Sequence, residues 1–167
     1  MKALLIVDMQ EIYVGKERNK KIFRYEAEQL IDRINERIKE YDAKNVFYIL
    51  NIFKNTWLNR LVPVIALEGT KGAKLVNSLE IVSQNFYYKN KGNAFTNKDL
   101  HTKLKELEVD EIEVVGVDGG GCAALTALGA LELEYKVQLN TDCIGTVFKK
   151  KAIKLNEQLS KNGGRII

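Results

Sequence analysis

Short apolar runs alternate along the chain with segments whose apolar residues recur at every third or fourth position. The short runs are rich in β-branched and aromatic residues, which is typical of strands, and they lie at 3–7, 46–50, 86–88, 111–117, 135–139 and 165–167. The first run is apolar throughout, as expected for a parallel strand that is buried on both faces. This alternation predicts βαβ units and an α/β fold with a mostly parallel sheet of five to six strands.

The longest periodic segment, 22–41, predicts an amphipathic helix because its apolar residues fall on one helical face. Those residues are Phe23, Ala27, Leu30, Ile31, Ile34 and Ile38. Four further helices are expected near 71–78, around 100–107, over 122–134 and over 152–159. Residues 53–70 contain the only proline, Pro63, and have no clear period, so we expect a loop or a lid there.

Length and composition fit one globular domain. The 167 residues are 46% hydrophobic and 29% charged, which is an ordinary globular composition. This length predicts a single domain over 1–167, and no repeat or linker divides it. The apolar stretch at 1–7 is too short for a signal-peptide core or a membrane span, so we expect a cytoplasmic protein that binds no membrane.

Charge and cysteine content disfavour several classes of function. The net charge of +4 is small, and the densest basic stretch, 149–151, opens an amphipathic segment. No aromatic residues alternate with these lysines to stack bases, so we interpret them as a solvated helix face and expect no nucleic-acid partner. Cys122 and Cys143 form no C-x-x-C pair, and without a secretory signal we expect reduced thiols. One histidine and two cysteines are too few for a common zinc site.

Polar residues at the ends of the expected strands are the first candidates for chemistry. Open parallel sheets bind ligands at the carboxyl ends of their strands, where the strand order reverses. The residues in this position are Asp8 and Gln10 after the first strand, Asn51 after the second, Lys89 after the third, 118–122 after the fourth and Asp142 after the fifth.

Cys122 has two features of a nucleophile. It follows three glycines and begins an expected helix, whose free N–H groups and partial positive charge favour a thiolate with a depressed pKa. The same N–H groups could receive an oxyanion. A small buried cysteine that packs the helix against the sheet would occupy the same position, so position alone leaves both interpretations open. Cys143 is interpreted as a structural residue in a turn.

A dinucleotide-binding motif is the competing interpretation of the same segment. Residues 119–124 fit G-x-G-x-x-A after a strand and at the start of a helix, with Asp142 after the next strand. That motif normally lies on the first βα unit, whereas here it follows the fourth strand. A run of three glycines also matches such a loose pattern easily, so we expect no dinucleotide cofactor.

Four segments match the motifs of one known family in order and spacing. The segment LLIVDMQEIY at 4–13 resembles an apolar run followed by D-x-Q-x-x-F, and LEGTKGA at 67–73 resembles E-G-T-x-G. The segment YKNKGNAF at 88–95 resembles K-x-x-x-S-A-F, and VVGVDGGGCAALTA at 114–127 resembles G-x-x-x-x-x-C-x-x-x-T-A. Together they resemble the isochorismatase-like cysteine hydrolases, which include nicotinamidases and N-carbamoylsarcosine amidases.

The resemblance implies a catalytic triad of Asp8, Lys89 and Cys122. It also implies a cis peptide at Val117–Asp118, which would aim the N–H groups of Asp118 and Cys122 at a developing oxyanion. The implied fold is a three-layer α-β-α, Rossmann-like structure with strand order 3-2-1-4-5-6. Family members commonly assemble as dimers or tetramers, so a homo-oligomer is implied.

The sequence departs from the family at the metal site and before the nucleophile. Nicotinamidases of the family bind a divalent metal through an Asp and two His near the end of the second strand, and the segment 51–57 has neither residue type. His101, the only histidine, is interpreted as a surface residue. True isochorismatases lack the cysteine, so vinyl-ether hydrolysis is disfavoured. The glycines at 119–121 replace bulkier residues and give the backbone extra freedom.

The function expected from these residues is metal-independent hydrolysis of a small amide or carbamoyl C–N bond by a cysteine nucleophile, without a cofactor. A small molecule is the expected substrate, and its expected contacts are Gln10, Tyr13, Phe53 and Trp57. The alternative is a non-catalytic member of the family that binds a metabolite or a protein partner on the same scaffold.

Overall fold

A computed structural model describes all residues from 1 to 167. Its six strands form one parallel sheet in the order β3-β2-β1-β4-β5-β6, as the resemblance implied. The strands are β1 (Lys2–Val7), β2 (Val46–Asn51), β3 (Phe86–Lys89), β4 (Glu111–Val117), β5 (Lys136–Gly145) and β6 (Arg165–Ile166).

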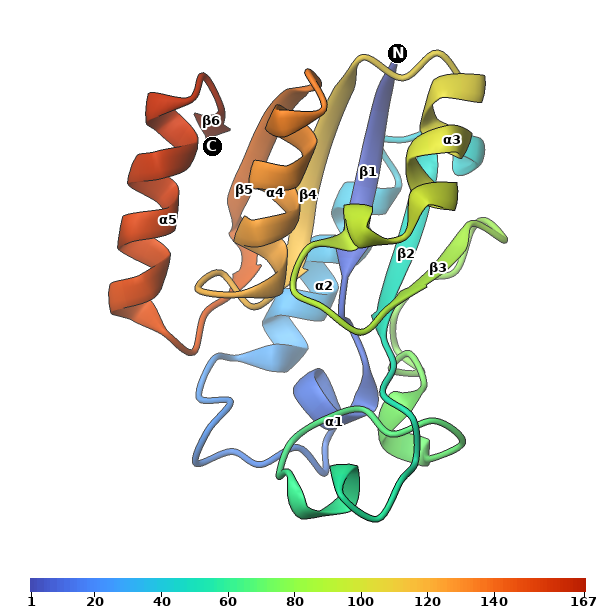
Figure 1. The fold of residues 1–167 in the computed structure, drawn as a ribbon, viewed down its shortest axis with the longest axis vertical. Coiled ribbons are helices and arrows are strands. Elements are labelled where there is room, and N and C mark those ends of the chain that lie inside the picture. Colours follow the sequence, from blue (N-terminus) through green and yellow to red (C-terminus); the bar gives the residue numbers. More distant parts are fainter.

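Helices cover both faces of the sheet and form the expected three layers (Figure 1). They are α1 (Glu11–Val14), α2 (Ala27–Ile38), α3 (Lys98–Glu106), α4 (Cys122–Glu132) and α5 (Lys149–Lys161). Single 3₁₀ turns lie at Ala43–Asn45, Asn59–Leu61, Lys71–Ala73 and Ala94–Thr96. No helix has both the length and the apolar character that crossing a membrane requires.

The side chains of β1 point alternately to the two faces of the sheet, and they belong to two separate halves of the hydrophobic core. Leu4 and Ile6 pack on the side of α2, whereas Leu5 and Val7 pack on the side of α3, α4 and α5. All four side chains are fully buried, because successive residues of a strand point to opposite faces and both faces carry helices. The uninterrupted apolar sequence of β1 thus places the strand at the centre of the sheet.

Two expected helices are shorter than their apolar spacing predicts. The predicted helix at 22–41 begins only at Ala27, because the N–H groups of Ile22 and Phe23 donate to the carbonyl of Asn19 and form a turn. The helix expected near 71–78 is a single 3₁₀ turn at Lys71–Ala73. The short helix α1 was not predicted.

The fifth strand is longer than predicted. The strand β5 continues to Gly145, because a register shift lets Ile144 and Gly145 pair with the end of β4 at Gly116 and Val117. Cys143 therefore lies in a strand, not in the expected turn, and it is buried and unpaired.

The order of the sheet reverses at β1, which pairs with β2 on one side and β4 on the other. The carboxyl ends of these strands therefore meet at the switch point where parallel sheets bind ligands. Figure 1 shows α1 and the segment around 53–70 beyond this edge of the sheet. The site is built from the residues that follow β1, β3 and β4.

Candidate active site

Asp8 and Lys89 form a buried ion pair across the sheet. Lys89 ends β3, and its Nζ donates to Oδ2 of Asp8 over 2.9 Å. The side chain spans the end of β2, since Lys89 is the register partner of Asn51. Asp8 and Lys89 are only 2% and 5% exposed. A buried charge needs a partner of opposite charge, so each residue requires the other.

The backbone of Asp8 turns this side chain into the site. Its φ of 54° lies in the left-handed region, and its N–H donates to the carbonyl of Ile49 over 2.9 Å. A residue other than glycine in this region costs about 1–3 kcal/mol and persists only where its surroundings enforce it. Here the hydrogen bond to β2 and the ion pair with Lys89 enforce it.

Cys122 begins α4, and its thiol shares a cavity lining with Asp8, close enough to Asp8 and Lys89 for both charged groups to shift its pKa. Burial and the nearby Asp8 carboxylate raise the pKa of the thiol to about 12, although Lys89 acts in the opposite direction. The expectation of a depressed thiol pKa is therefore wrong. Lys89 does not outweigh burial and Asp8, so the resting nucleophile is a neutral thiol that needs a base.

Asp8 is positioned to be that base. Burial raises its pKa above the usual range, while Lys89 partly offsets the effect. Oδ2 is used by Lys89, and Oδ1 is buried without a hydrogen-bond partner. A carboxylate with one free oxygen and a raised pKa has the chemistry of a general base.

The loop from Asp118 to Gly121 is held in place by hydrogen bonds. The Val117–Asp118 peptide is cis, as the resemblance implied. The N–H of Gly119 donates to the carbonyl of Gly145 over 3.0 Å, and that of Val147 donates to Oδ1 of Asp118 over 2.6 Å. These bonds tie the loop to the end of β5 and the residues beyond it.

Close packing explains the glycines of this loop. A Cβ on Gly119 would collide with the side chain of Thr146, and one on Gly120 would lie 2.5 Å from the carbonyl oxygen of Phe148. Gly119 and Gly120 are therefore required by the approach of the segment after β5. The extra backbone freedom expected from the glycine run is restrained by this packing and by the hydrogen bonds.

A mostly apolar cavity of about 210 Å³ lies over the thiol. Its walls are Asp8, Tyr13, Ile22, Phe23, Tyr25, Asn51, Val64, Val117, Asp118, Gly121, Cys122, Val147 and Phe148. Ligand cavities usually measure about 300–1,000 Å³, so this one suits a small ligand. Most of its walls are hydrophobic, which strengthens the electrostatic interactions of the few polar groups inside it.

Of the four residues expected to contact substrate, Tyr13 alone lines this cavity. Gln10 is fully buried beside it, and its side chain joins three backbone groups: it donates to the carbonyls of Asn51 and Ala73 and accepts from the N–H of Asn51. Gln10 therefore fixes the backbone after β1. Phe53 forms a bridge with Leu67 outside the cavity, and Trp57 is 71% exposed on the surface.

Sequence reasoning did not predict the walls of the catalytic cavity that two loops contribute. Phe23 was assigned to a helix face, yet it lies in the segment before α2, and its ring meets that of Tyr13 edge to face at 5.6 Å. Tyr25 donates from its hydroxyl to the carbonyl of Tyr13 over 3.0 Å. Val147 and Phe148 come from the segment after β5. These contacts join residues far apart in sequence, and no local pattern signals them.

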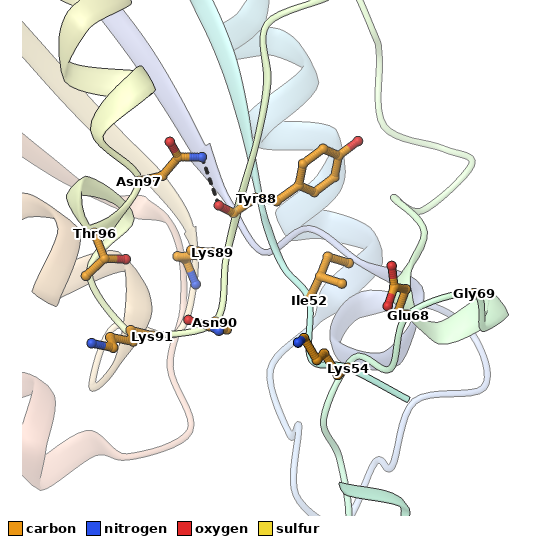
Figure 2. Close-up of a pocket in the computed structure, with 10 residues that line it drawn as sticks. All are labelled: Ile52, Lys54, Glu68, Gly69, Tyr88, Lys89, Asn90, Lys91, Thr96 and Asn97. Atoms are coloured by element: carbon orange, nitrogen blue, oxygen red, sulfur yellow. Dashed lines mark hydrogen bonds between the residues drawn. The ribbon is translucent and has the colours of Figure 1, made fainter. Parts of the chain in front are cut away.

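A second, polar cavity of about 760 Å³ lies at the carboxyl end of β3 (Figure 2). Lys54 and Glu68 lie on one side of it, and Lys91 and Thr96 lie on the other (Figure 2). Lys89 also lines this cavity, although its Nζ is bound to Asp8. This cavity contains no thiol, and the hydroxyl of Thr96 donates to the carbonyl of Asn93, so we place the candidate chemistry at Cys122.

The donors of the family's metal site do not fit this chain. No three side chains of His, Cys, Asp or Glu converge anywhere in the structure. The segment 51–57 at the end of β2 contributes no such group. His101 lies on α3 with Nδ1 at 3.0 Å from the hydroxyl of Tyr135, away from the candidate site.

Comparisons with known proteins bear on the family and the fold of the chain. A family model described as the isochorismatase domain matches residues 2–167. An uncharacterised isochorismatase family protein of Bacillus subtilis, YaaI, is 31% identical over 152 residues, which cover 87% of this chain and 81% of the relative.

Solved structures show the same fold at lower identity. A pyrazinamidase/nicotinamidase of Streptococcus mutans superposes with a TM-score of 0.82 at 20% identity, covering 100% of both chains. An N-carbamoylsarcosine amidase of Thermoplasma acidophilum superposes with a TM-score of 0.80 at 15% identity, covering 99% of this chain and 94% of that one.

Proposed function

Because the chain belongs to the isochorismatase family, we propose that it is a cysteine hydrolase that cleaves an amide or carbamoyl C–N bond of a small molecule without a metal. One observation carries the proposal: the buried Asp8–Lys89 pair lies beside the Cys122 thiol at the base of a small apolar cavity. Solved structures with this fold include proteins named as amidases, which agrees with that bond type.

Acylation begins with the neutral thiol. As the carbonyl carbon of the substrate approaches Sγ, the free oxygen of Asp8 takes the thiol proton, and the new S–C bond forms. Lys89 keeps a positive charge beside the carboxylate and the developing thiolate. The proton on Asp8 then passes to the leaving nitrogen as the C–N bond breaks, and ammonia or an amine departs.

Hydrolysis of the thioester reverses these roles. Asp8, again ionised, takes a proton from water, and the hydroxyl oxygen attacks the thioester carbon. The S–C bond breaks, and Sγ regains a proton through Asp8. One carboxylate thus serves as base and acid in turn, so its raised pKa suits both halves of the reaction.

Two backbone N–H groups are available to the oxyanion. Neither Asp118 nor Cys122 donates its N–H to another backbone carbonyl outside helices and strands, and the first residue of a helix has no acceptor within it. Donors of this kind stabilise a tetrahedral intermediate when they are already in position, and removing one donor costs about a hundredfold or more in rate.

The test is a panel of small amides and carbamoyl compounds assayed for ammonia release and for an acyl adduct by mass spectrometry. We expect Cys122→Ala to abolish both signals. Cys143→Ala is the matched control, because it removes the other thiol, which lies in β5 outside the cavity, and it should retain both. Equal turnover by the wild type and Cys122→Ala would refute the mechanism.

A non-catalytic binding role is the second candidate, favoured by the neutral state of the thiol. It predicts that ligands of the cavity raise the melting temperature equally in the wild type and in Cys122→Ala, with no adduct and no released amine. Adduct formation on Cys122 alone would exclude this role as the complete function.

A further inference from the structure

A strongly basic cavity of about 850 Å³ adjoins the catalytic cavity. Five cations line it, and no carboxylate does. They are Lys21, Arg24, Lys149, Lys150 and Lys151. None of the five takes part in an ion pair, whereas seven other cationic groups of the structure, counting the N-terminus, are paired with carboxylates. This surface therefore holds an excess of positive charge.

Three of the cations lie at the N-terminus of α5, where the helix dipole disfavours positive charge. Lys149, Lys150 and Lys151 form the first turn of this helix, which contains no acidic residue. The N-terminus of a helix carries partial positive charge, so anions are favoured there and cations are disfavoured. The three lysines and the helix N-terminus together concentrate positive potential beside the cavity. An anion bound there would reduce the repulsion among these positive charges.

The basic and catalytic cavities share a wall. Ile22, Tyr25, Val147 and Phe148 line both of them. The Oδ1 atom of Asp118 accepts from the N–H of Val147, so the loop before Cys122 is bonded directly to the segment that leads into the lysines. A ligand that extends out of the catalytic cavity past this wall meets the five cations.

We propose that the substrate carries an anionic group, a carboxylate or a phosphate, that binds in the basic cavity while its amide lies at Cys122. This inference rests on the proposed hydrolase function and narrows its substrate class. The catalytic cavity, at about 210 Å³, admits a small head group and is lined mostly by apolar side chains. The charge of the substrate therefore has to lie outside it, and the adjoining cavity supplies five cations that form no ion pair.

Lysines 149–151 are exposed on the first turn of α5, as expected for a solvated helix face, and they also line the basic cavity. The sequence separates these lysines from Lys21 and Arg24 by more than a hundred residues, and the fold brings them to one cavity. The exposed aromatic ring of Phe148 lies at the junction of the two cavities.

Matched alkylating reagents test the proposal without requiring the natural substrate. Iodoacetate and iodoacetamide react with a thiol by the same displacement of iodide, and they differ in charge. The rates at Cys122 are measured by mass spectrometry in a Cys143→Ala background, in which Cys122 is the single thiol. The test variant is Lys149→Gln/Lys150→Gln/Lys151→Gln. Its control is Lys98→Gln/Lys154→Gln/Lys161→Gln, which removes three exposed charges that line neither cavity.

We expect the ratio of the iodoacetate rate to the iodoacetamide rate to fall about threefold to tenfold in the 149–151 variant, because local charge steers anions to a site. The control variant should keep the wild-type ratio within about twofold, since its charges line neither cavity. Added salt should reduce the wild-type ratio and leave the 149–151 variant nearly unchanged.

A substrate comparison gives a second readout. Among amides of matched length, we expect the wild type to hydrolyse succinamate with a higher kcat/KM than neutral succinamide, and the 149–151 variant to lose this preference mainly through KM. An alkylation ratio that is the same in both triple variants overturns the anionic substrate class while leaving the hydrolase intact. Failure of Cys122 to react with either reagent, together with absent turnover, overturns the proposed nucleophile itself.

Discussion

At the scale of single residues, the chemistry depends on what Asp8 does to its neighbours. Its carboxylate is balanced by Lys89, and it raises the pKa of the Cys122 thiol. The thiol is therefore kept neutral by the group that is proposed to deprotonate it. Such an arrangement protects a buried nucleophile from unwanted reactions, because thiolate forms only when a substrate carbonyl is there to accept the sulfur.

Replacing Asp8 by Asn should separate thiol reactivity from catalysis. Loss of the carboxylate removes a cause of the raised thiol pKa, so the pKa should fall below about 12 and alkylation by iodoacetamide at pH 8 should become about tenfold faster. Hydrolysis should fall about a hundredfold or more, because the general base is gone. The measurements are alkylation rate against pH and ammonia release.

Asp142→Asn is the control for this experiment, since Asp142 is an exposed carboxylate in β5 and does not line the catalytic cavity. It should leave both rates unchanged. Slower alkylation in Asp8→Asn would contradict the view that Asp8 holds the thiol in its neutral form.

At the scale of elements, a polar cluster joins α2 to the sheet far from the cavity. Glu113 of β4 is fully buried and accepts two hydrogen bonds of 2.6 Å from Arg37 of α2. It also accepts from Tyr41 over 2.7 Å and from Asn140 over 3.0 Å, and it pairs with Lys2 at 2.9 Å. Each oxygen of the carboxylate is thus satisfied, which makes the buried charge tolerable.

Glu113→Gln should change the dependence of stability on pH. Although burial raises the pKa of Glu113, its hydrogen bonds with Arg37 and Lys2 hold the pKa at about 2, below the ordinary 4.5. Because the pKa is lower in the folded state than in the unfolded chain, the ionised carboxylate stabilises the fold at pH values above 4.5. That stabilisation is lost as the pH falls from 4.5 towards 2. The free energy of unfolding of the variant should be about 1.5–3 kcal/mol lower at pH 7, and it should fall less steeply than that of the wild type at acid pH.

Urea denaturation from pH 7 to pH 2 measures both effects. Glu157→Gln, which removes an exposed carboxylate of α5, should follow the wild-type curve. Parallel curves for the wild type and Glu113→Gln would argue against this role of the cluster.

The elements that could be predicted from sequence are those with a strong local pattern. The apolar runs of β1, β2 and β4 are buried in the sheet as expected. The end of β5 could not be predicted, because it pairs with β4 only after a register shift. Residues 22–25 have helical spacing, yet they turn to line the cavity, since hydrogen bonds to Asn19 and Tyr13 compete with the helix.

At the scale of the whole molecule, the site depends on contacts between residues that lie far apart in the sequence. The motifs predicted Asp8, Lys89 and Cys122, and the fold brings these three together. The basic cavity was not predicted, because its cations come from two segments whose charges are ordinary when each is viewed alone. Local patterns identify which residues are polar, whereas neighbouring strands and loops decide which of them share a cavity.

The surface of the molecule carries an apolar segment, 57–62, that a monomer would leave in water. Trp57 and Leu61 are 71% and 72% exposed, and Leu58 and Val62 beside them are also exposed. Clustered apolar side chains on a surface are typical of an interface with another protein. The segment lies beyond the carboxyl edge of the sheet and leads into Val64, a wall of the catalytic cavity.

We therefore expect the homo-oligomer that the family resemblance implies to bury this segment, so that Trp57→Glu/Leu61→Glu yields a monomer. A carboxylate has to leave water to enter an apolar interface, and this penalty is large unless a cation pairs with it. Light scattering coupled to size-exclusion chromatography measures the mass. Ile153→Glu is the control, because Ile153 is 60% exposed on α5 and should tolerate a charge without dissociation. Dissociation by Ile153→Glu and not by the double variant would move the interface to α5, and a wild-type protein that is already monomeric would rule out this interface altogether.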